Sequence, residues 1–176
     1  MAEPSTAPWA ALEARIQALE DIEAIKELKA RYWRMLDQRN WDALRDTMLP
    51  DAVLDMDGIP VCEGREVFVN ICIEAAKVPG QFNAHHGHNA RIWMTGKDSA
   101  EGTWDAWFQG IDATNRTVLT LTNHYSDQYV RQGGRWWIKR LEARQTAFSF
   151  QQVDADGTPK YSVLGTPTLN AYPDAT

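Results

Sequence analysis

The apolar pattern of this chain changes at Pro79-Gly80, and this change restricts the fold more than any other feature of the sequence. Before it, apolar residues recur every three or four positions, as on amphipathic helices. After it come runs rich in β-branched and aromatic residues, separated by turn signals, as in β-strands. Helices followed by an antiparallel meander predict an α+β fold, with N-terminal helices packed on one face of a strongly curved antiparallel sheet.

The helical part begins with an unusually long amphipathic helix, expected from Trp9 to about Asp37. Its apolar stripe comprises Leu12, Ile16, Leu19, Ile22, Ile25, Leu28, Tyr32, Met35 and Leu36. A short second helix is expected over residues 39–48, stopped by Pro50, and a third over residues 64–78. A short strand is expected over residues 52–58, between these two helices. Four long strands should follow, over residues 82–94, 99–112, 116–131 and 135–153.

The organisation along the chain is that of a single domain over residues 9–153, long enough to bury a core. Residues 1–8 contain Pro, Ser and Thr and are expected to be a flexible N-terminus. Residues 154–176 are rich in Pro, Gly and Thr and are expected to form a C-terminal loop or tail. The sequence contains no internal repeats.

Charge and cysteine content exclude several classes of protein. The net charge is −6 and no basic stripe stands out, which argues against a nucleic-acid partner. Cys62 and Cys72 fit neither zinc-ligand spacing nor a disulfide framework, so we expect reduced thiols. The N-terminus lacks a signal peptide pattern, and no apolar run approaches the ~20 residues that cross a bilayer. A cytoplasmic protein without a membrane partner is expected.

Three of the four histidines lie in the stretch "QFNAHHGHNARI", residues 81–92. On a strand, His86 and His88 point to one face and His85 to the other, beside Asn83. All three could bind one metal ion only if this alternation were broken. A site built from His86 and His88 alone stays possible, although no carboxylate lies at an obvious third-ligand spacing. Taken alone, His85 is either a hydrogen-bonded core residue or a general base.

Three stretches carry a family resemblance: "DIEAIKELKARYWRMLDQRNWDAL" over residues 21–44, "AHHGHNARI" over 84–92 and "NHYSDQYVRQGGRWWIKR" over 123–140. They resemble the SnoaL-like branch of the nuclear transport factor 2-like superfamily, and are especially similar to bile acid 7α-dehydratases. The resemblance covers roughly residues 10–150. It implies a cone-shaped α+β barrel, in which helices close one face of a bent sheet over a deep apolar pocket.

The resemblance also implies a catalytic set. Tyr32, Asp37 and His85 match the tyrosine, aspartate and histidine of the dehydratases. Five residues on a helix is ~140° of rotation, so the convergence of Tyr32 with Asp37 is implied by the resemblance alone. Asp37 would accept a hydrogen bond from His85 and fix its tautomer. Hexachlorocyclohexane dehydrochlorinases place an arginine where this chain has Arg144, and bile acid dehydratases place theirs at Gln145. We expect Arg144, and a bulge would exchange the two.

The expected pocket is aromatic and mostly apolar. Alternation and the resemblance predict these substrate-binding residues: Asn83, Trp104, Phe108, Leu121, Asn123, Tyr125 and Gln145. Phe108 stands where the bile acid enzymes have an acidic residue, while Asp105 falls on the opposite face. The complete bile acid dehydratase set is therefore absent. Each of these residues taken singly is also a plausible core residue, but together they suit a substrate that contains rings.

By resemblance we expect a cofactor-independent lyase without a metal, acting on a hydrophobic, ring-containing, hydroxylated substrate by acid/base-assisted elimination. The reaction would be dehydration, as in scytalone dehydratases, or carbon–carbon cleavage with formaldehyde release from a lignin-derived diarylpropane. His85 would be the base, and Tyr32 and Arg144 would stabilise developing charge. The alternatives are a non-catalytic module for small-ligand binding or oligomerisation, and a ketosteroid-type isomerase. Related proteins assemble through the outer sheet face, so a homo-oligomer, a trimer or dimer, is expected, with Trp107 at that face.

Overall fold

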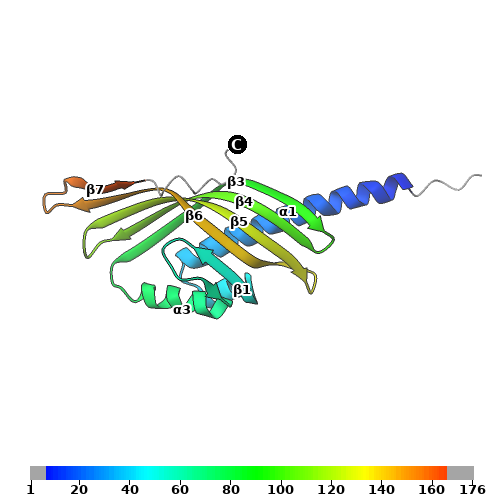
Figure 1. The fold of residues 1–176 in the computed structure, drawn as a ribbon, viewed down its shortest axis with the longest axis horizontal. Helices are drawn as coiled ribbons and strands as arrows, with labels where there is room; N and C mark the ends of the chain where they lie inside the picture. The colour runs from blue at the N-terminus through cyan, green and yellow to red at the C-terminus, as the bar shows by residue number, and fades with distance from the viewer. Residues whose placement is uncertain (1–6, 166–176) are drawn as a thin grey trace, which may run out of the picture.

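The protein is a curved sheet with helices on one face (Figure 1). The structure, a computed structural model, describes residues 7–165 and the side chains of residues 9–161. Its helices are α1 (Ala7–Asp37), α2 (Trp41–Arg45) and α3 (Arg65–Ala76). The predicted α+β class is confirmed. Most of the expected flexible N-terminus, residues 1–6, lies outside the described residues.

The sheet is mixed, not purely antiparallel. Its strands are β1 (Met48–Met56), β2 (Cys62–Glu63), β3 (Gln81–Gly96), β4 (Ser99–Asp112), β5 (Thr117–Gln132), β6 (Arg135–Val153) and β7 (Pro159–Gly165). The order is β2-β1-β6-β5-β4-β3, with β7 also paired to β6. The expectation of an antiparallel sheet fails at β1, which runs parallel to β6. The short α2 delivers the chain to the end where β6 begins, and Thr47 O accepts a hydrogen bond from Ile138 N at 3.0 Å.

The C-terminal segment is not the expected loop. After β6 the chain turns through residues 154–158, where Asp154 N donates to Thr158 O at 2.9 Å, and returns as β7 antiparallel to β6. The Pro-, Gly- and Thr-rich composition therefore encodes a hairpin turn and an edge strand. Residues 166–176, the remainder of the predicted tail, lie outside the described residues.

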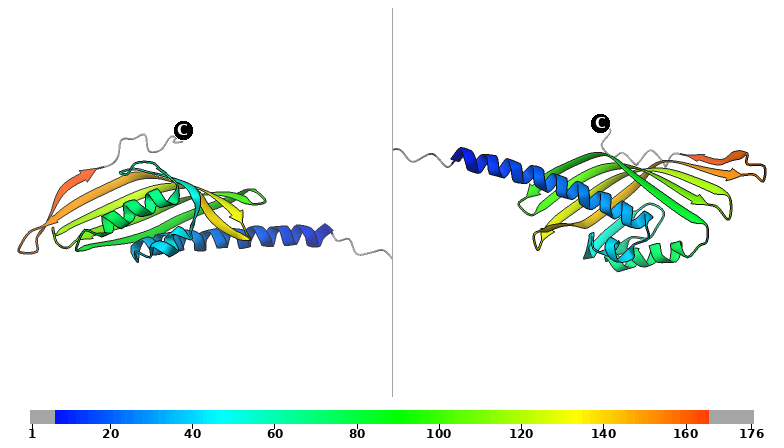
Figure 2. Two further views of the ribbon diagram at one scale, coloured as in Figure 1. Left: turned by 90° about the horizontal axis from the view of Figure 1, so that it is seen from below. Right: turned by 180° about the vertical axis from the view of Figure 1, so that it is seen from behind.

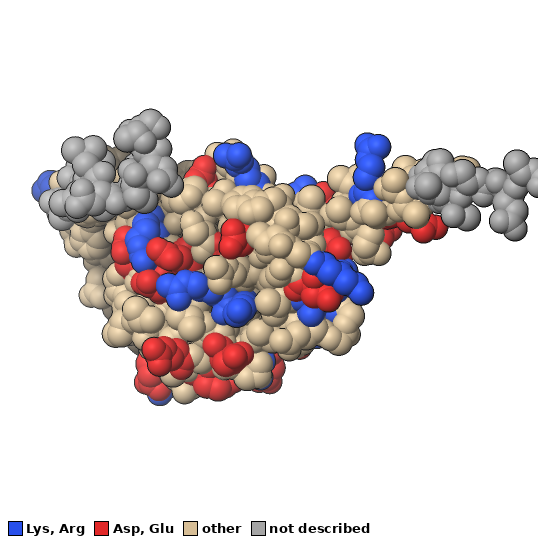
Figure 3. All heavy atoms as spheres, turned by 45° about the vertical axis from the view of Figure 1, so that its right-hand side comes forward, with Lys and Arg blue, Asp and Glu red and all other residues tan. Residues whose placement is uncertain are grey.

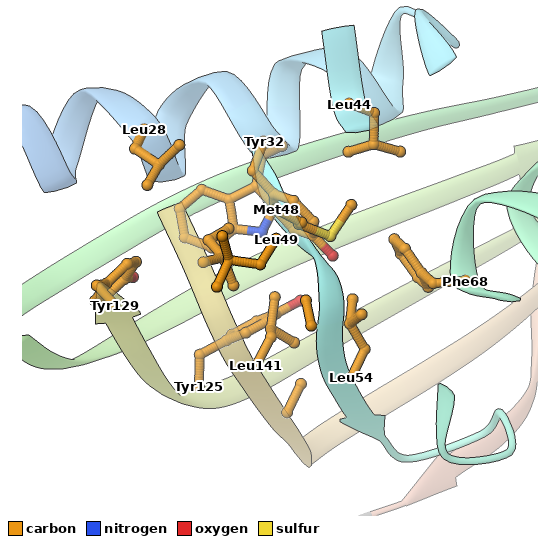
Figure 4. Close-up of a cluster of buried hydrophobic side chains, with 14 of the residues drawn as sticks. Leu28, Tyr32, Leu44, Met48, Leu49, Leu54, Phe68, Tyr125, Tyr129 and Leu141 are labelled. Carbon is orange, nitrogen blue, oxygen red and sulfur yellow. The ribbon is translucent and has the colours of Figure 1, made fainter. Parts of the chain in front are cut away.

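The core lies between α1, β1 and the inner face of the sheet (Figure 4). Ile25, Leu28 and Tyr32 enter it from α1. The helix crosses β3 so closely at Gly87 that a Cβ atom there would lie 2.0 Å from the ring of Trp33. Only glycine fits at this crossing. Because Gly87 is two residues from His85, the crossing also fixes which face His85 presents.

The N-terminal half of α1 projects beyond the sheet (Figures 1 and 2). The sequence predicted one continuous apolar stripe from Leu12 onward, but the apolar residues of α1 are buried only from Ile25. Within residues 7–165, no helix combines the length and apolar character needed to cross a membrane. Figure 3 shows acidic and basic side chains interspersed on one face of the molecule, in agreement with the expected absence of a basic stripe there.

Candidate active site

A cavity of about 310 Å³ lies between the C-terminal end of α1, α3 and the inner face of the sheet. Its walls are mostly apolar. The lining residues are Tyr32, Leu36, Arg39, Trp41, Met56, Asp57, Ile59, Phe68, Ile71, Cys72, Ala75, Ala76, Gln81, Asn83, His85, Phe108, Leu121, Asn123, Tyr125, Ala143 and Gln145. The volume is at the lower end of the range for small-molecule sites, about 300–1,000 Å³.

His85 lines the cavity and forms a hydrogen-bonded pair with Asp37. Asp37 Oδ1 lies 2.6 Å from His85 Nδ1, and Asp37 Oδ2 accepts the backbone N–H of His85 at 2.9 Å. An ionised carboxylate only accepts hydrogen bonds, so it places the imidazole proton on Nδ1 and leaves Nε2 as a base. The contact expected from the sequence is therefore present. The catalytic role of the pair stays a prediction.

The end of α1 brings Asp37 to β3. Asp37 is the last residue of the helix, and Arg39 follows with a φ of 55°. The Arg39 guanidinium donates to the carbonyl oxygens of Ala76 and Gln81, which ties the helix end to the junction of α3 and β3. At the helix end the carboxylate lies beside the strand that carries His85. The ~140° between Tyr32 and Asp37 is therefore no obstacle to a shared cavity.

Tyr32 is buried on the cavity side of α1, where its ring stacks on Phe68 with centroids 6.3 Å apart (Figure 4). Burial raises the pKa of Tyr32 well above its ordinary value and the pKa of Tyr125 to about 12. Both phenols therefore keep their protons at neutral pH and present O–H donors. Burial likewise raises the pKa of Cys72 to about 12, so this free thiol is not a nucleophile at neutral pH.

A buried ion pair lies next to the rings of Tyr32 and Tyr125. Lys29 Nζ is 2.6 Å from Asp127 Oδ2, and both side chains are fully buried. The ammonium lies 5.1 Å from the ring centroid of Tyr32 and 4.3 Å from that of Tyr125. Burial lowers the pKa of Lys29 and raises that of Asp127, while their attraction opposes both shifts. The hydroxyl of Tyr129 donates to Asp127 at 2.7 Å.

The sequence carries a signal for this ion pair, although we did not predict it. Lys29 lies on the buried stripe of α1, four residues after Ile25 and four before Trp33. Asp127 lies between Tyr125 and Tyr129 on the inward-facing positions of β5. A cation and an anion on two buried faces indicate pairing, because neither is tolerated alone in a core.

Six of the seven predicted binding residues line the cavity: Asn83, Phe108, Leu121, Asn123, Tyr125 and Gln145. Trp104 does not, which corrects the prediction. It is on the inner face, as alternation required, but beneath α1, where its ring meets Trp33 edge-on at 5.6 Å. Its indole N–H donates to the hydroxyl of Tyr129 at 3.0 Å. Trp104 is therefore part of the core.

The geometry places Arg144 away from the cavity, which corrects the choice of this residue over Gln145. Arg144 Nη2 donates to Asp55 Oδ2 and Glu142 Oε1, each at 2.9 Å. The cause is a bulge at Lys139: Tyr129 pairs with Ile138, but Gln128 pairs with Arg140. One extra residue reverses the faces of the side chains that follow, as far as a second bulge at Thr146. Gln145 consequently faces the cavity, and its backbone N–H donates to Asp57 at 2.9 Å.

The cavity residues that were not predicted come mainly from α3 and from the connections. Phe68, Ile71, Cys72 and Ala75 recur at helical spacing and form the face of α3 over the cavity. That amphipathic spacing was visible in the sequence. Asp57 and Ile59, in the connection after β1, carried no comparable signal.

The other histidines lie on the outer face, which is the side of the sheet away from α1 and the cavity. His86 and His88 are exposed there, as alternation predicted. His124 Nδ1 is 2.9 Å from Asp105 Oδ1, and Asn89 donates to the second oxygen of Asp105 at 2.8 Å. Among the described residues, no group of three His, Cys, Asp or Glu side chains is arranged to hold a metal ion.

Comparison with known proteins identifies a family and several solved structures with a similar fold. A family model described as a SnoaL-like domain matches residues 17–142. A protein of Novosphingobium aromaticivorans, provisionally assigned as a scytalone dehydratase, aligns with a TM-score of 0.70 and 19% identity over 86% of this chain and 95% of that one. A type 2 hexachlorocyclohexane dehydrochlorinase aligns with a TM-score of 0.65 and 20% identity, over 89% and 95%. An NTF2-like protein with a cystatin-like fold from Novosphingobium aromaticivorans gives 0.67 and 21%, over 83% and 92%.

Proposed function

The chain belongs to the SnoaL-like domain family, and on that premise we propose that it is a lyase that works without a cofactor on a small, ring-containing, hydroxylated substrate. One observation carries the proposal. His85, paired with Asp37, is in the wall of a mostly apolar cavity, with its Nε2 left as a base. The names of two structural relatives denote eliminations, of hydrogen chloride and of water.

The chemistry follows from the protonation states of the lining groups. His85 Nε2 takes a proton from a substrate carbon next to an activating group, and the Asp37 carboxylate stabilises the imidazolium that forms. The electron pair of the broken C–H bond forms the new double bond as the adjacent C–O bond breaks. Tyr32, whose raised pKa keeps it protonated at neutral pH, gives its phenol proton to the departing hydroxyl, so that water leaves. The proton on His85 then returns to Tyr32 through solvent.

Each of these groups contributes a rate enhancement of known magnitude. A positioned general base gives ~10²–10⁴-fold, and one hydrogen-bond donor to a developing oxyanion gives ~10²–10³-fold. Together they are adequate for a substrate whose proton is already acidified by a neighbouring carbonyl or aromatic ring. Arg144 takes no part in this mechanism, because its guanidinium is bonded to Asp55 and Glu142.

The lining indicates the class of substrate. Phe68, Phe108 and Tyr125 offer aromatic surface to a ring, while Asn83 and Asn123 offer amide groups to hydroxyls or carbonyls. Diarylpropane diols from lignin fit this description. For them His85 would take the proton of the terminal hydroxyl, and the adjacent carbon–carbon bond would break to release formaldehyde. The electron pair of that bond would form the new double bond as the neighbouring hydroxyl leaves as water with the proton of Tyr32.

The experiment is turnover with product masses. Purified protein with a chelator and no added cofactor is incubated with hydroxylated polycycles and with diarylpropane diols. His85→Ala is the test variant, and His124→Ala on the outer face is its matched control. With wild type and His124→Ala, but not with His85→Ala, we expect products lighter than the substrate by one water, or by one formaldehyde and one water. Turnover that survives in His85→Ala would contradict the mechanism. Compounds that raise the melting temperature of both variants equally, without turnover, would indicate a binding module.

A further inference from the structure

The projecting half of α1 carries a second apolar surface, distinct from the core. Trp9, Leu12, Ile16 and Leu19 leave 68%, 43%, 46% and 64% of their surface exposed. We call these four residues the α1 stripe. Their spacing of three, four and three is that of the a and d positions of a heptad, the pattern by which two helices pair. The stripe is on the part of α1 that extends beyond the sheet (Figures 1 and 2).

The α1 stripe faces away from the body of the protein. Nine residues separate exposed Ile16 from buried Ile25, and nine separate Leu19 from Leu28. Nine residues on an α-helix is about two and a half turns, so the two apolar surfaces are on opposite sides of α1. The cause is visible in the sequence, where four successive steps of three between residues 16 and 28 carry the apolar positions around the helix. A second helix can therefore reach the stripe without meeting the sheet.

We propose that the occupant is the α1 stripe of a second copy of this chain, in a short parallel two-stranded coiled coil. With Trp9 and Ile16 at position a, Arg15 is at g and Glu20 at the following e. In a parallel pair these two positions meet across the seam, giving two Arg15–Glu20 contacts. In an antiparallel pair e meets e and g meets g. With Trp9 opposite Leu19 and Leu12 opposite Ile16, the twofold axis passes at residue 14, so Glu13 and Arg15 would each face their own copies. These like charges select the parallel arrangement.

The geometry of the bodies agrees with this pairing. Asp21 occupies the f position of the same heptads, on the side of the helix opposite the seam, and it is buried against the body by Arg131 at 2.6 Å and Trp136 at 3.0 Å. Each body therefore lies on the outside of its own helix. The pairing uses a different surface from the outer sheet face and does not depend on the proposed catalytic function.

The first test is the mass of the full chain by sedimentation equilibrium across a range of concentrations. Ile16→Glu places a charge in the seam and should weaken self-association at least about tenfold. Ala14→Glu is the matched control: it adds the same charge to the same turn, but at the outward f position, and should leave the mass unchanged. Far-UV circular dichroism checks that both variants keep their helix content.

The second test addresses orientation. Ile16→Cys should form a disulfide between two copies on mild oxidation, because a faces a only in the parallel pair, and Ala14→Cys should not. Arg15→Glu should weaken association, and adding Glu20→Arg should restore it. A wild type that stays monomeric, a mass unaffected by Ile16→Glu, equal cross-linking at positions 14 and 16, or failure of the double charge variant to recover would each overturn the proposal. Coverage of the stripe by residues 1–6 or 166–176 would show itself as the monomeric result.

Discussion

Two aspartate–histidine pairs lie on opposite faces of the same sheet. In the inner pair, Asp37 Oδ1 is 2.6 Å from His85 Nδ1, and in the outer pair Asp105 Oδ1 is 2.9 Å from His124 Nδ1. The bonding is alike, but the exposure differs. The side chains of His85 and Asp37 are 15% and 24% exposed, whereas those of His124 and Asp105 are 36% and 50% exposed.

The surroundings of an aspartate–histidine pair determine its chemistry more than the hydrogen bond within the pair does. Asp105 and His124 are direct partners across β4 and β5, so ordinary register brings them together. Asp37 and His85 meet only because a helix end is fixed against β3. The inner pair lies beside apolar walls and a protonated phenol, where electrostatic interactions are strong, while solvent screens the outer pair. We therefore expect opposite results when equivalent residues of the two pairs are changed.

The largest effect should come from removing the imidazoles. His85→Ala removes the base and should lower kcat/KM by ~10²–10⁴-fold, whereas His124→Ala should leave it within about twofold. Initial rates on whichever substrate the mass experiment identifies provide the measurement. Equal losses in the two variants would show that the contrast between inner and outer pairs has no catalytic meaning.

Removing one carboxylate charge should have the next largest effect. Asp37→Asn keeps the shape but no longer stabilises an imidazolium, and its amide N–H₂ can impose the wrong tautomer on His85. We expect a loss of about 10³-fold in kcat, by analogy with other carboxylate–imidazole pairs. Asp105→Asn is the control and should change kcat by less than twofold. Asp37→Asn should also destabilise the fold by roughly 1–2 kcal/mol in urea unfolding, because a charge-assisted bond to the backbone of β3 is weakened.

Alternation along strands made the inner pair partly predictable. It placed His85 opposite His86 and His88, and it placed Phe108 inside and Asp105 outside. Such inferences hold wherever a strand runs without interruption. The contact between Asp37 and His85 was not derivable from spacing, since the carboxylate reaches β3 from a helix end, and only family resemblance indicated it.

Prediction failed where local geometry departs from regular periodicity. The bulge at Lys139 exchanged Arg144 for Gln145, and a bulge leaves little trace in composition. Trp104 had the correct face, but its distance from the cavity depends on how far α1 extends over the sheet. The tail expected after residue 153 proved to contain β7, because Pro and Gly mark turns as readily as they mark loops.

Tyr32 is a further difference between the two faces, because its phenol lines the same cavity as His85. Tyr32→Phe removes only the hydroxyl and should lower kcat by about 10²-fold. The matched control is Tyr161→Phe, at an exposed tyrosine on β7, which should have no effect. Because burial raises the pKa of Tyr32 well above 10, the phenol stays protonated through pH 10. The alkaline limb of the rate profile should therefore be the same in wild type and Tyr32→Phe, and a limb that disappears in the variant would contradict the donor role.

Substitution of Arg144 should have the smallest effect on kcat/KM, and it tests whether the outer face takes part in catalysis. It is the direct partner of His124 across β5 and β6, and its guanidinium is bonded to Asp55. Arg144→Gln should therefore leave kcat/KM within about twofold. The side chains are partly exposed, so the cost in unfolding free energy at pH 7 should be only ~1 kcal/mol. Lys139→Gln, at an exposed residue of the same strand, controls for the lost charge.

The difference in unfolding free energy between wild type and Arg144→Gln should depend on pH. The hydrogen bond from Arg144 lowers the pKa of Asp55 below its ordinary value of 3.8. A depressed pKa means that the folded state binds the proton less readily, so the stabilisation is complete above pH 3.8 and is lost as the pH falls through the lowered pKa. Arg144→Gln should reduce that dependence to the smaller contribution of Arg140, and its unfolding free energy should approach that of wild type at low pH. A difference that persists there, or an activity loss above tenfold at pH 7, would place Arg144 with the inner pair.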